Sequence, residues 1–209
     1  INTEDYLMAD IDKELQKLND DLLQICRLTQ GAIRKTSGVL MCFDVEKTQE
    51  IIDNNKKISV LSVTYEDYFT SIVRQYQHDG NASKLISSSI NVNRELKQIS
   101  DLTAEVAKSL SSLNTDILDN YKINISQFAI IFQSIVWDSV ISFLKQDAAL
   151  AKKTIVTSLA LKKICSRRQD ELIERNKTAE SAGRDGTVLL FIIQSVRDIA
   201  THIVNIAKI

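Results

Sequence analysis

The sequence contains no proline and only five glycines among its 209 residues. Average usage would supply roughly ten prolines and about fifteen glycines in a chain of this length. Turns between strands draw heavily on these two residues, so their scarcity excludes a meander, a sandwich or a barrel of short strands. Clustered glycines are also missing, which argues against the phosphate loops of Rossmann and P-loop enzymes. An all-α protein with long helices and few connections remains.

An excess of charge of one sign is missing as well. The chain has 26 basic and 27 acidic residues and a net charge of −1. This balance gives no electrostatic reason to expect nucleic acid or an anionic membrane surface as a partner. The three cysteines, Cys26, Cys42 and Cys165, are widely spaced and form neither a zinc nor a disulfide framework. Each lies beside apolar positions, so we interpret them as small buried side chains in a reducing compartment.

Long hydrophobic runs are rare too. The most apolar run, residues 128–144, is broken by polar residues between Gln133 and Ser139, and we expect no segment to span a bilayer. No signal-peptide pattern is found. The sequence begins at Ile1 rather than at a methionine, and we expect that its natural start is missing and that it can be a piece of a longer protein.

What the chain does contain is six segments in which apolar residues recur at steps of three and four, as in amphipathic helices. The first helix is expected to end at a turn between Gly31 and Gly38, the second to run from about Asp44 to a turn at residues 78–81, and the third to end at the polar residues 111–116. The fourth has apolar residues from Tyr121 to Ile135, the fifth begins near Asp147, and the sixth spans residues 187–209. The expected apolar face of the fifth consists of Ile155, Leu159, Leu161, Ile164 and Leu172.

The two halves of the chain repeat each other. A shift of 100 residues places Ile99 on Ile199, Ala107 on Ala207 and Lys108 on Lys208. Self-similarity at a fixed offset indicates a duplicated structural unit. We therefore predict two three-helix bundles, residues 1–113 and 114–209, packed as one unit.

Candidates for catalysis are few. A nucleophile needs a base beside it, and the chain has only two histidines, neither close in sequence to a motif with Ser or Cys. His78 falls in an expected turn. His202 falls on the apolar side of the last helix, where a hydrogen-bonded structural histidine is the commoner outcome. We expect no enzyme, and we interpret the pair Arg167–Arg168 as covering a helix flank rather than binding phosphate.

Metal binding is a more specific alternative to catalysis. Carboxylates four residues apart share one helix face and can hold an oxygen-loving cation between helices. Glu46 with Glu50 and Asp101 with Glu105 have this spacing. Because a quarter of the chain is charged, surface ion pairs are the plainer interpretation of the same residues.

Three segments resemble a known family. Residues 96–107 read LKQISDLTAEVA and residues 196–207 read VRDIATHIVNIA. Both are similar to the pattern L-E-R-I-G-D-x-A-x-N-I-A in the third helix of each bundle of the PhoU family. Residues 51–58, IIDNNKKI, are similar to its V-I-E-x-D-x-x-I-D segment. The resemblance, which covers the whole six-helix plan, implies tandem three-helix bundles.

The resemblance also implies a function. It implies a cytoplasmic, non-enzymatic regulator of phosphate uptake and phosphate homeostasis, present as a homodimer. Its expected partners are phosphate transporter components or a sensor kinase. Contact with a membrane, at its inner face, is expected only through a transporter, and nucleic acid is not expected.

The family's metal positions are altered in this chain. Acidic pairs on these helices are associated with multinuclear metal sites in the family. The corresponding residues here are Lys97 and Asp101, Arg197 and Thr201, and Asn55 and Ser59, whose repeat partners lie near Ser158 and Lys162. A lysine or arginine places a fixed positive charge where a cation would bind. We predict that the family's iron or other metal clusters are absent, with Asp101 and His202 as the remaining candidate ligands.

Three alternatives stay open. One is the soluble cytoplasmic C-terminal domain of a sodium/phosphate cotransporter, which the start at Ile1 and the lost metal positions favour. Another is a metal-binding helical bundle that uses other carboxylates. The third is a scaffold whose role is unrelated to phosphate.

Overall fold

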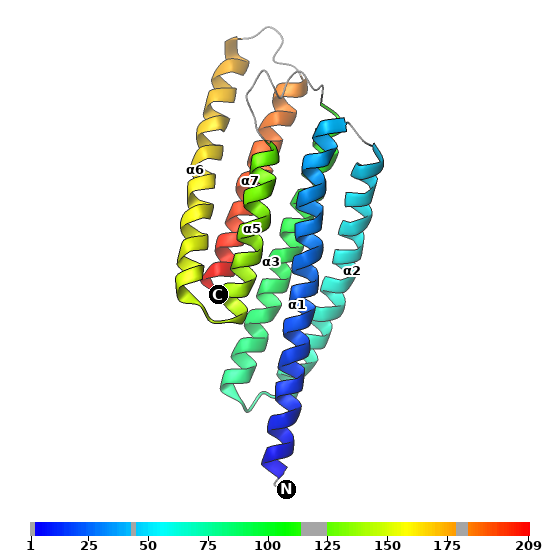
Figure 1. Cartoon of the computed structure of the whole chain (residues 1–209), viewed down its shortest axis with the longest axis vertical. Coiled ribbons are helices and arrows are strands. Elements are labelled where there is room, and N and C mark those ends of the chain that lie inside the picture. Colours follow the sequence, from blue (N-terminus) through cyan, green and yellow to red (C-terminus); the bar gives the residue numbers. More distant parts are fainter. Residues whose placement is uncertain (1–2, 43–44, 114–124, 179–183) are drawn as a thin grey trace.

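The computed structural model describes residues 3–42, 45–113, 125–178 and 184–209. These ranges hold six α-helices and no strand (Figure 1). The helices are α1 (Thr3–Cys42), α2 (Val45–Gln75), α3 (Gly80–Leu110), α5 (Ile125–Leu144), α6 (Ala148–Thr178) and α7 (Arg184–Lys208). The predicted all-α fold of six long helices is confirmed.

The helices form two bundles that share a seam. α1, α2 and α3 pack on one another, and α5, α6 and α7 do the same. α3 also packs along α7, and α1 along α5, so the buried side chains of both bundles form one continuous core. Figure 1 shows α2 and α6 at opposite outer edges, each remote from the other bundle. The seam between the bundles is therefore built by α1, α3, α5 and α7.

Aspartates cap α3 and α6. The Asp79 carboxylate accepts hydrogen bonds of 3.0 Å from the backbone N–H groups of Asn81 and Ala82. Asp147 accepts in the same way from Ala149 and Leu150, at 3.0 and 2.9 Å. A side-chain oxygen at this position satisfies N–H groups that have no partner inside the helix. The predicted turn at residues 78–81 and the predicted helix start near Asp147 are both confirmed.

The apolar residues that recur along α3 form one buried stripe. All of its members are buried, namely Val92, Leu96, Ile99, Thr103, Val106, Leu110 and Leu113. α3 ends at Leu110, where the polar residues begin, as predicted. Of the other expected ends, Asp44 and Tyr121 lie outside the described residues.

The predicted turn between Gly31 and Gly38 is wrong. α1 continues through both glycines to Cys42. A glycine inside a helix costs about 1 kcal/mol relative to alanine. Ala32, Ile33 and Val39 beside these glycines are buried in the core, and their packing offsets that cost.

The predicted apolar face of the fifth helix, α6, is wrong in part. Leu161 and Leu172 are buried, but Leu159 and Ile164 are 50% and 43% exposed. The buried face consists of Thr154, Ser158, Leu161, Cys165 and Leu172. This face packs on α7 and α5, and several aliphatic residues lie on the opposite, exposed side.

Two stretches are long and apolar enough, by length and composition, to cross a membrane. They are Gln127–Leu144 in α5 and Asp185–Lys208 in α7. The expectation that no segment spans a bilayer stays a prediction, because length and composition alone do not show that a helix crosses a membrane. In the fold, 44% and 50% of these stretches is buried, because α5 and α7 pack against each other and against the other bundle. Mostly buried core helices pass the same test.

Candidate functional site

Lys97 and Asp101, at the first altered acidic pair, bond to each other. The Lys97 ammonium lies 2.6 Å from the Asp101 carboxylate, one turn along α3. Both side chains are half-buried. The Asp101 carboxylate, at a position that the family resemblance associates with metal, is thus paired with a cation on the same helix.

Asn55 ties α2 to α3. The Ser100 hydroxyl, which is fully buried, donates a 2.7 Å hydrogen bond to Asn55 Oδ1. Ser59, one turn further along α2, is half-buried. Both side chains are neutral, so the Asn55 bond holds the two helices together without the excess of negative charge that favours a cation.

Arg197 occupies the equivalent place in the second bundle. Its guanidinium donates to Gln169 Oε1 on α6 at 3.1 Å and to Gln194 Oε1 at 2.5 Å. Gln194 in turn donates to both oxygens of Asp198 at 2.9 Å. Thr201 takes no part, since its hydroxyl bonds back to the Arg197 carbonyl at 3.1 Å. The arginine therefore joins α7 to α6 through neutral amides.

His202 lies in the seam between the bundles. Its Nδ1 is 2.6 Å from Glu95 Oε2 on α3. The Asn205 amide, one turn further along α7, donates to the same carboxylate at 3.2 and 3.3 Å. A second inter-bundle bond runs from the Gln30 amide on α1 to the Gln133 carbonyl on α5, at 2.7 Å. The two candidate ligands, Asp101 and His202, thus take different partners.

Sequence reasoning missed Glu95, which lies in the seam, and Gln169, which lies between α6 and α7 of the second bundle. Each carries the hydrogen bond that orients a residue on another helix. The available signal for Glu95 was its position beside Leu96, on the flank of the buried stripe of α3. Nothing in the sequence distinguishes that glutamate from the other acidic residues of the chain.

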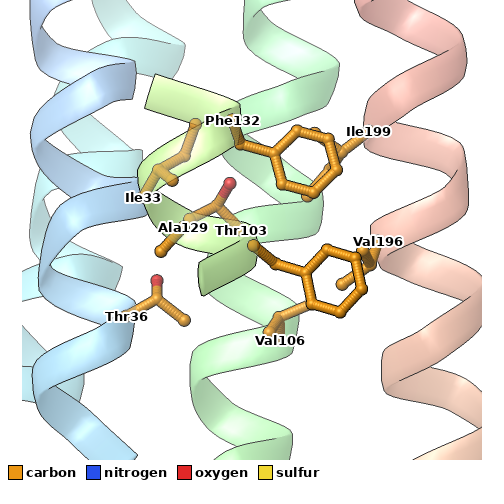
Figure 2. Close-up of a pocket in the computed structure, with 9 residues that line it drawn as sticks. Ile33, Thr36, Thr103, Val106, Ala129, Phe132, Val196 and Ile199 are labelled. Carbon is orange, nitrogen blue, oxygen red and sulfur yellow. The ribbon is translucent and has the colours of Figure 1, made fainter. Parts of the chain in front are cut away.

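A small cavity also lies at the junction of the two bundles. Its volume is about 30 Å³, and it is lined by Ile33, Thr36, Thr103, Val106, Phe128, Ala129, Phe132, Val196 and Ile199. Figure 2 shows these side chains converging from the helices that form the seam. The Thr36 and Thr103 hydroxyls donate to the Ala32 and Ile99 carbonyls of their own helices, at 3.0 and 2.7 Å. The cavity therefore has an apolar wall.

The remaining candidates lie on the surface or take other partners. Glu50 pairs with Lys35 at 2.6 Å. Glu105 and His78 are exposed. Arg167 and Arg168 both pair with Glu171 on their own helix, at 3.6 and 2.8 Å. Within the described ranges, no three His, Cys, Asp or Glu side chains come together in a way that could hold a metal ion.

Two of the cysteines are buried and free, as predicted. Burial raises the pKa of the Cys26 thiol to about 12. It raises that of Cys165 to about 11, against the opposing effect of the Arg197 cation. Thiols with such pKa values stay protonated at neutral pH and are poor nucleophiles. The Cys42 side chain lies outside the part that the structure describes.

The described residues form two bundles in which the polar side chains between helices bond to one another. The profile of the PhoU domain matches residues 22–110 and 125–209, which cover most of both bundles. The chain belongs to the PhoU family. The predicted family resemblance is confirmed.

Relatives and solved structures of the PhoU family agree. A phosphate-specific transport system accessory protein PhoU homolog from Aquifex aeolicus is 29% identical over 143 residues, 68% of this chain and 65% of that protein. PhoU homolog 1 from Methanothermobacter thermautotrophicus is 22% identical over 142 residues, with the same two shares. The match therefore spans less than two thirds of the length of these relatives.

Two crystal structures share the fold. The phosphate transport system regulatory protein PhoU from Streptococcus pneumoniae has a TM-score of 0.81 at 21% identity, over 95% of this chain and 93% of that one. PhoU from Pseudomonas aeruginosa has a TM-score of 0.70 at 15% identity, over 94% and 95%. The tandem three-helix architecture is thus common to the three proteins.

Proposed function

We propose that this chain is an accessory regulator of a phosphate transport system, which restrains phosphate uptake by contacting a transporter component or a sensor kinase on the cytoplasmic side of the membrane. One observation carries the proposal: the PhoU profile matches both bundles. The relatives that the chain resembles are described as accessory proteins of phosphate-specific transport. The homodimer that the resemblance implies stays a prediction, which sedimentation equilibrium tests.

We propose that the chain acts by binding its partner and not by catalysing a reaction. His202 is engaged by Glu95 in the seam, and the Cys26 and Cys165 thiols are buried with raised pKa values. His202 is therefore occupied by a structural contact, and the two thiols are not free to act as nucleophiles. These contacts support a protein that works through its surface.

We also propose that the chain works without the family's multinuclear metal clusters. Three contacts support this: Lys97 with Asp101, Asn55 with Ser100, and Arg197 with Gln169. Each uses groups at an altered acidic position for bonding within the protein. A metal cation would meet the fixed positive charge of Lys97 or Arg197 at two of these places, and neutral side chains at the third.

To test the proposal, the gene is deleted in the source organism and phosphate uptake is measured. We expect faster uptake of radiolabelled phosphate in the deletion strain, and return to the original rate when the full chain is expressed again. A double variant, His78→Ala with His202→Gln, should restore the rate as well as the wild-type chain, because glutamine keeps a donor for Glu95.

Two results would count against the proposal. Unchanged uptake and an unchanged starvation response in the deletion strain would contradict a role in phosphate transport. Loss of restoration by the histidine variant, with the variant still folded by circular dichroism, would contradict a purely non-catalytic role.

A further inference from the structure

The outer helix of the second bundle, α6, carries an uneven charge. Residues 148–169 contain six basic residues and no acidic one, although the net charge of the whole chain is −1. The basic residues are Lys152, Lys153, Lys162, Lys163, Arg167 and Arg168. The outer helix of the first bundle, α2, has five acidic and four basic residues along its whole length. The positive charge is thus particular to one of two helices with the same place in the repeat.

Aliphatic side chains are exposed on the same side of α6. Val156, Leu159 and Ile164 are 67%, 50% and 43% exposed. They alternate along the helix with lysines and an arginine that are exposed as well. We define the basic–apolar face of α6 as Lys152, Lys153, Val156, Leu159, Lys163, Ile164 and Arg167. At 3.6 residues per turn these positions form one continuous stripe over four turns.

The charge of this face is largely uncompensated. Within the described ranges, none of the four lysines of α6 between residues 152 and 163 has an acidic group within ion-pair distance. The described ion pairs of α6 involve Arg167 and Arg168, which share Glu171. α6 lies at an outer edge of the fold (Figure 1), and the side chains of this face are exposed. Lysines in this state are available to an anionic surface.

We propose that the basic–apolar face of α6 docks on an anionic phospholipid surface. Clusters of four to eight lysines and arginines are attracted to such surfaces at about 1 kcal/mol for each cation, and aliphatic side chains between them enter the headgroup region. A protein partner fits less well, because lysine is depleted and aromatic residues are enriched at protein interfaces. α6 contains lysines and no aromatic residue.

The local charge explains why the whole-chain composition gave the opposite expectation. A net charge of −1 averages the cations of α6 with the acidic residues of the other helices. Surface attraction depends on charges within about a Debye length, roughly 8 Å at physiological salt. A single basic face can therefore bind an anionic surface on a protein that is neutral overall.

The test is co-sedimentation of the full chain with two kinds of vesicle. One is pure phosphatidylcholine, and the other contains about one third phosphatidylserine. We expect binding to the anionic vesicles alone, and its loss in about 1 M salt, where the Debye length is about 3 Å. The double variant Lys152→Gln/Lys153→Gln should lower the partition coefficient about 25-fold, which corresponds to about 1 kcal/mol per cation.

The first bundle supplies a matched control. Lys56→Gln/Lys57→Gln removes the same charge from the exposed side of α2, and we expect a change below about twofold. The pair Val156→Ser/Leu159→Ser should weaken binding more than Val60→Ser/Val63→Ser, which alters two exposed valines of α2.

Three outcomes would overturn the proposal. The first is no binding to anionic vesicles at low salt. The second is equal losses for the α6 and α2 variants. The third is self-association, seen by sedimentation without lipid, that depends on the α6 residues while vesicle binding does not. That last result would make the face a contact between protein chains.

Discussion

The two bundles differ in where their polar side chains bond. In the first bundle they reach across to another helix: Asn93 on α3 donates to the Ser62 carbonyl on α2 at 2.9 Å, and Ser100 donates to Asn55 at 2.7 Å. In the second bundle, the buried Ser139 and Ser158 donate to carbonyls of their own helices, at 2.7 and 2.8 Å. Its described side-chain bond between α7 and α6, from Arg197 to Gln169, is only half-buried. The same architecture is thus held in register in two ways.

The register of a bundle depends on contacts between its helices. A bond between two helices fixes how they slide along each other, and its loss leaves a buried donor or acceptor unsatisfied. A bond within one helix carries no such information. We infer that buried side-chain hydrogen bonds set the register of α2 against α3, whereas apolar packing, with the half-buried bond from Arg197 to Gln169, sets that of α6 against α7.

The largest expected effect comes from cutting one bond between helices. Asn93→Ala should lower the free energy of unfolding by about 2 kcal/mol, because it removes a buried hydrogen bond and leaves space. Ser158→Ala should change it by less than about 0.5 kcal/mol, since the lost hydroxyl bonds only its own helix. Urea unfolding measures both. Equal losses in the two variants would remove the distinction between the bundles.

A second prediction concerns the seam that joins the bundles. Glu95→Ala should cost about 1–2 kcal/mol, because His202 and Asn205 both lose their shared acceptor. Glu105→Ala, an exposed residue of the same helix, should cost less than about 0.5 kcal/mol. Thermal unfolding followed by calorimetry measures both values. If Glu95→Ala is as mild as its control, the hydrogen bonds of Glu95 do not stabilise the seam.

The third prediction compares glycines in the two bundles. Gly31 lies inside α1 with nothing within 4 Å of an added Cβ, so Gly31→Ala should stabilise the protein by about 0.5–1 kcal/mol. At Gly186 in α7, an added Cβ would lie 2.7 Å from the Asn176 side chain. Gly186→Ala should therefore gain less, or lose stability. Chemical denaturation of both variants measures the difference, and a destabilised Gly31→Ala would contradict the open surroundings of that residue.

The smallest effect is a pH dependence in the first bundle. Burial raises the pKa of the Asp21 carboxyl on α1, against the opposing effect of the Lys17 cation, and Asp21 Oδ2 is buried with no hydrogen-bond partner in the described structure. A carboxyl whose pKa is raised by folding favours the folded state at low pH and loses that contribution as pH rises through the folded pKa.

Asp21→Asn should therefore stabilise the protein at pH 7 by less than about 1 kcal/mol. The gain should vanish on acidification below the ordinary pKa of aspartate, near 4. Urea unfolding at the two pH values tests this. A gain that stays the same at both would show that ionisation of Asp21 is not its cause.

Most of the fold could be predicted from the sequence because periodic apolar residues and capping aspartates act locally. The buried stripe of α3 and the caps at Asp79 and Asp147 follow from such signals. The helix through Gly31 and Gly38 could not be predicted, because packing of residues distant in sequence outweighs the local cost of glycine.

Two other features could not be read from the sequence. α6 has aliphatic residues on two sides, so periodicity alone did not show that Leu159 and Ile164 face outwards. At the site, the sequence identified which acidic positions had changed but not their new partners. Glu95 meets His202, and Gln169 meets Arg197, only once the helices pack.

The metal content of the purified full chain tests most directly whether the altered acidic positions exclude metal. It is measured by inductively coupled plasma mass spectrometry after incubation with excess ferrous iron and removal of free metal. We predict less than one iron per chain, with unfolding unchanged by a chelator, because Lys97 and Arg197 occupy the altered positions. Two or more irons per chain would contradict the claim that this PhoU-family protein closes its seams with its own side chains.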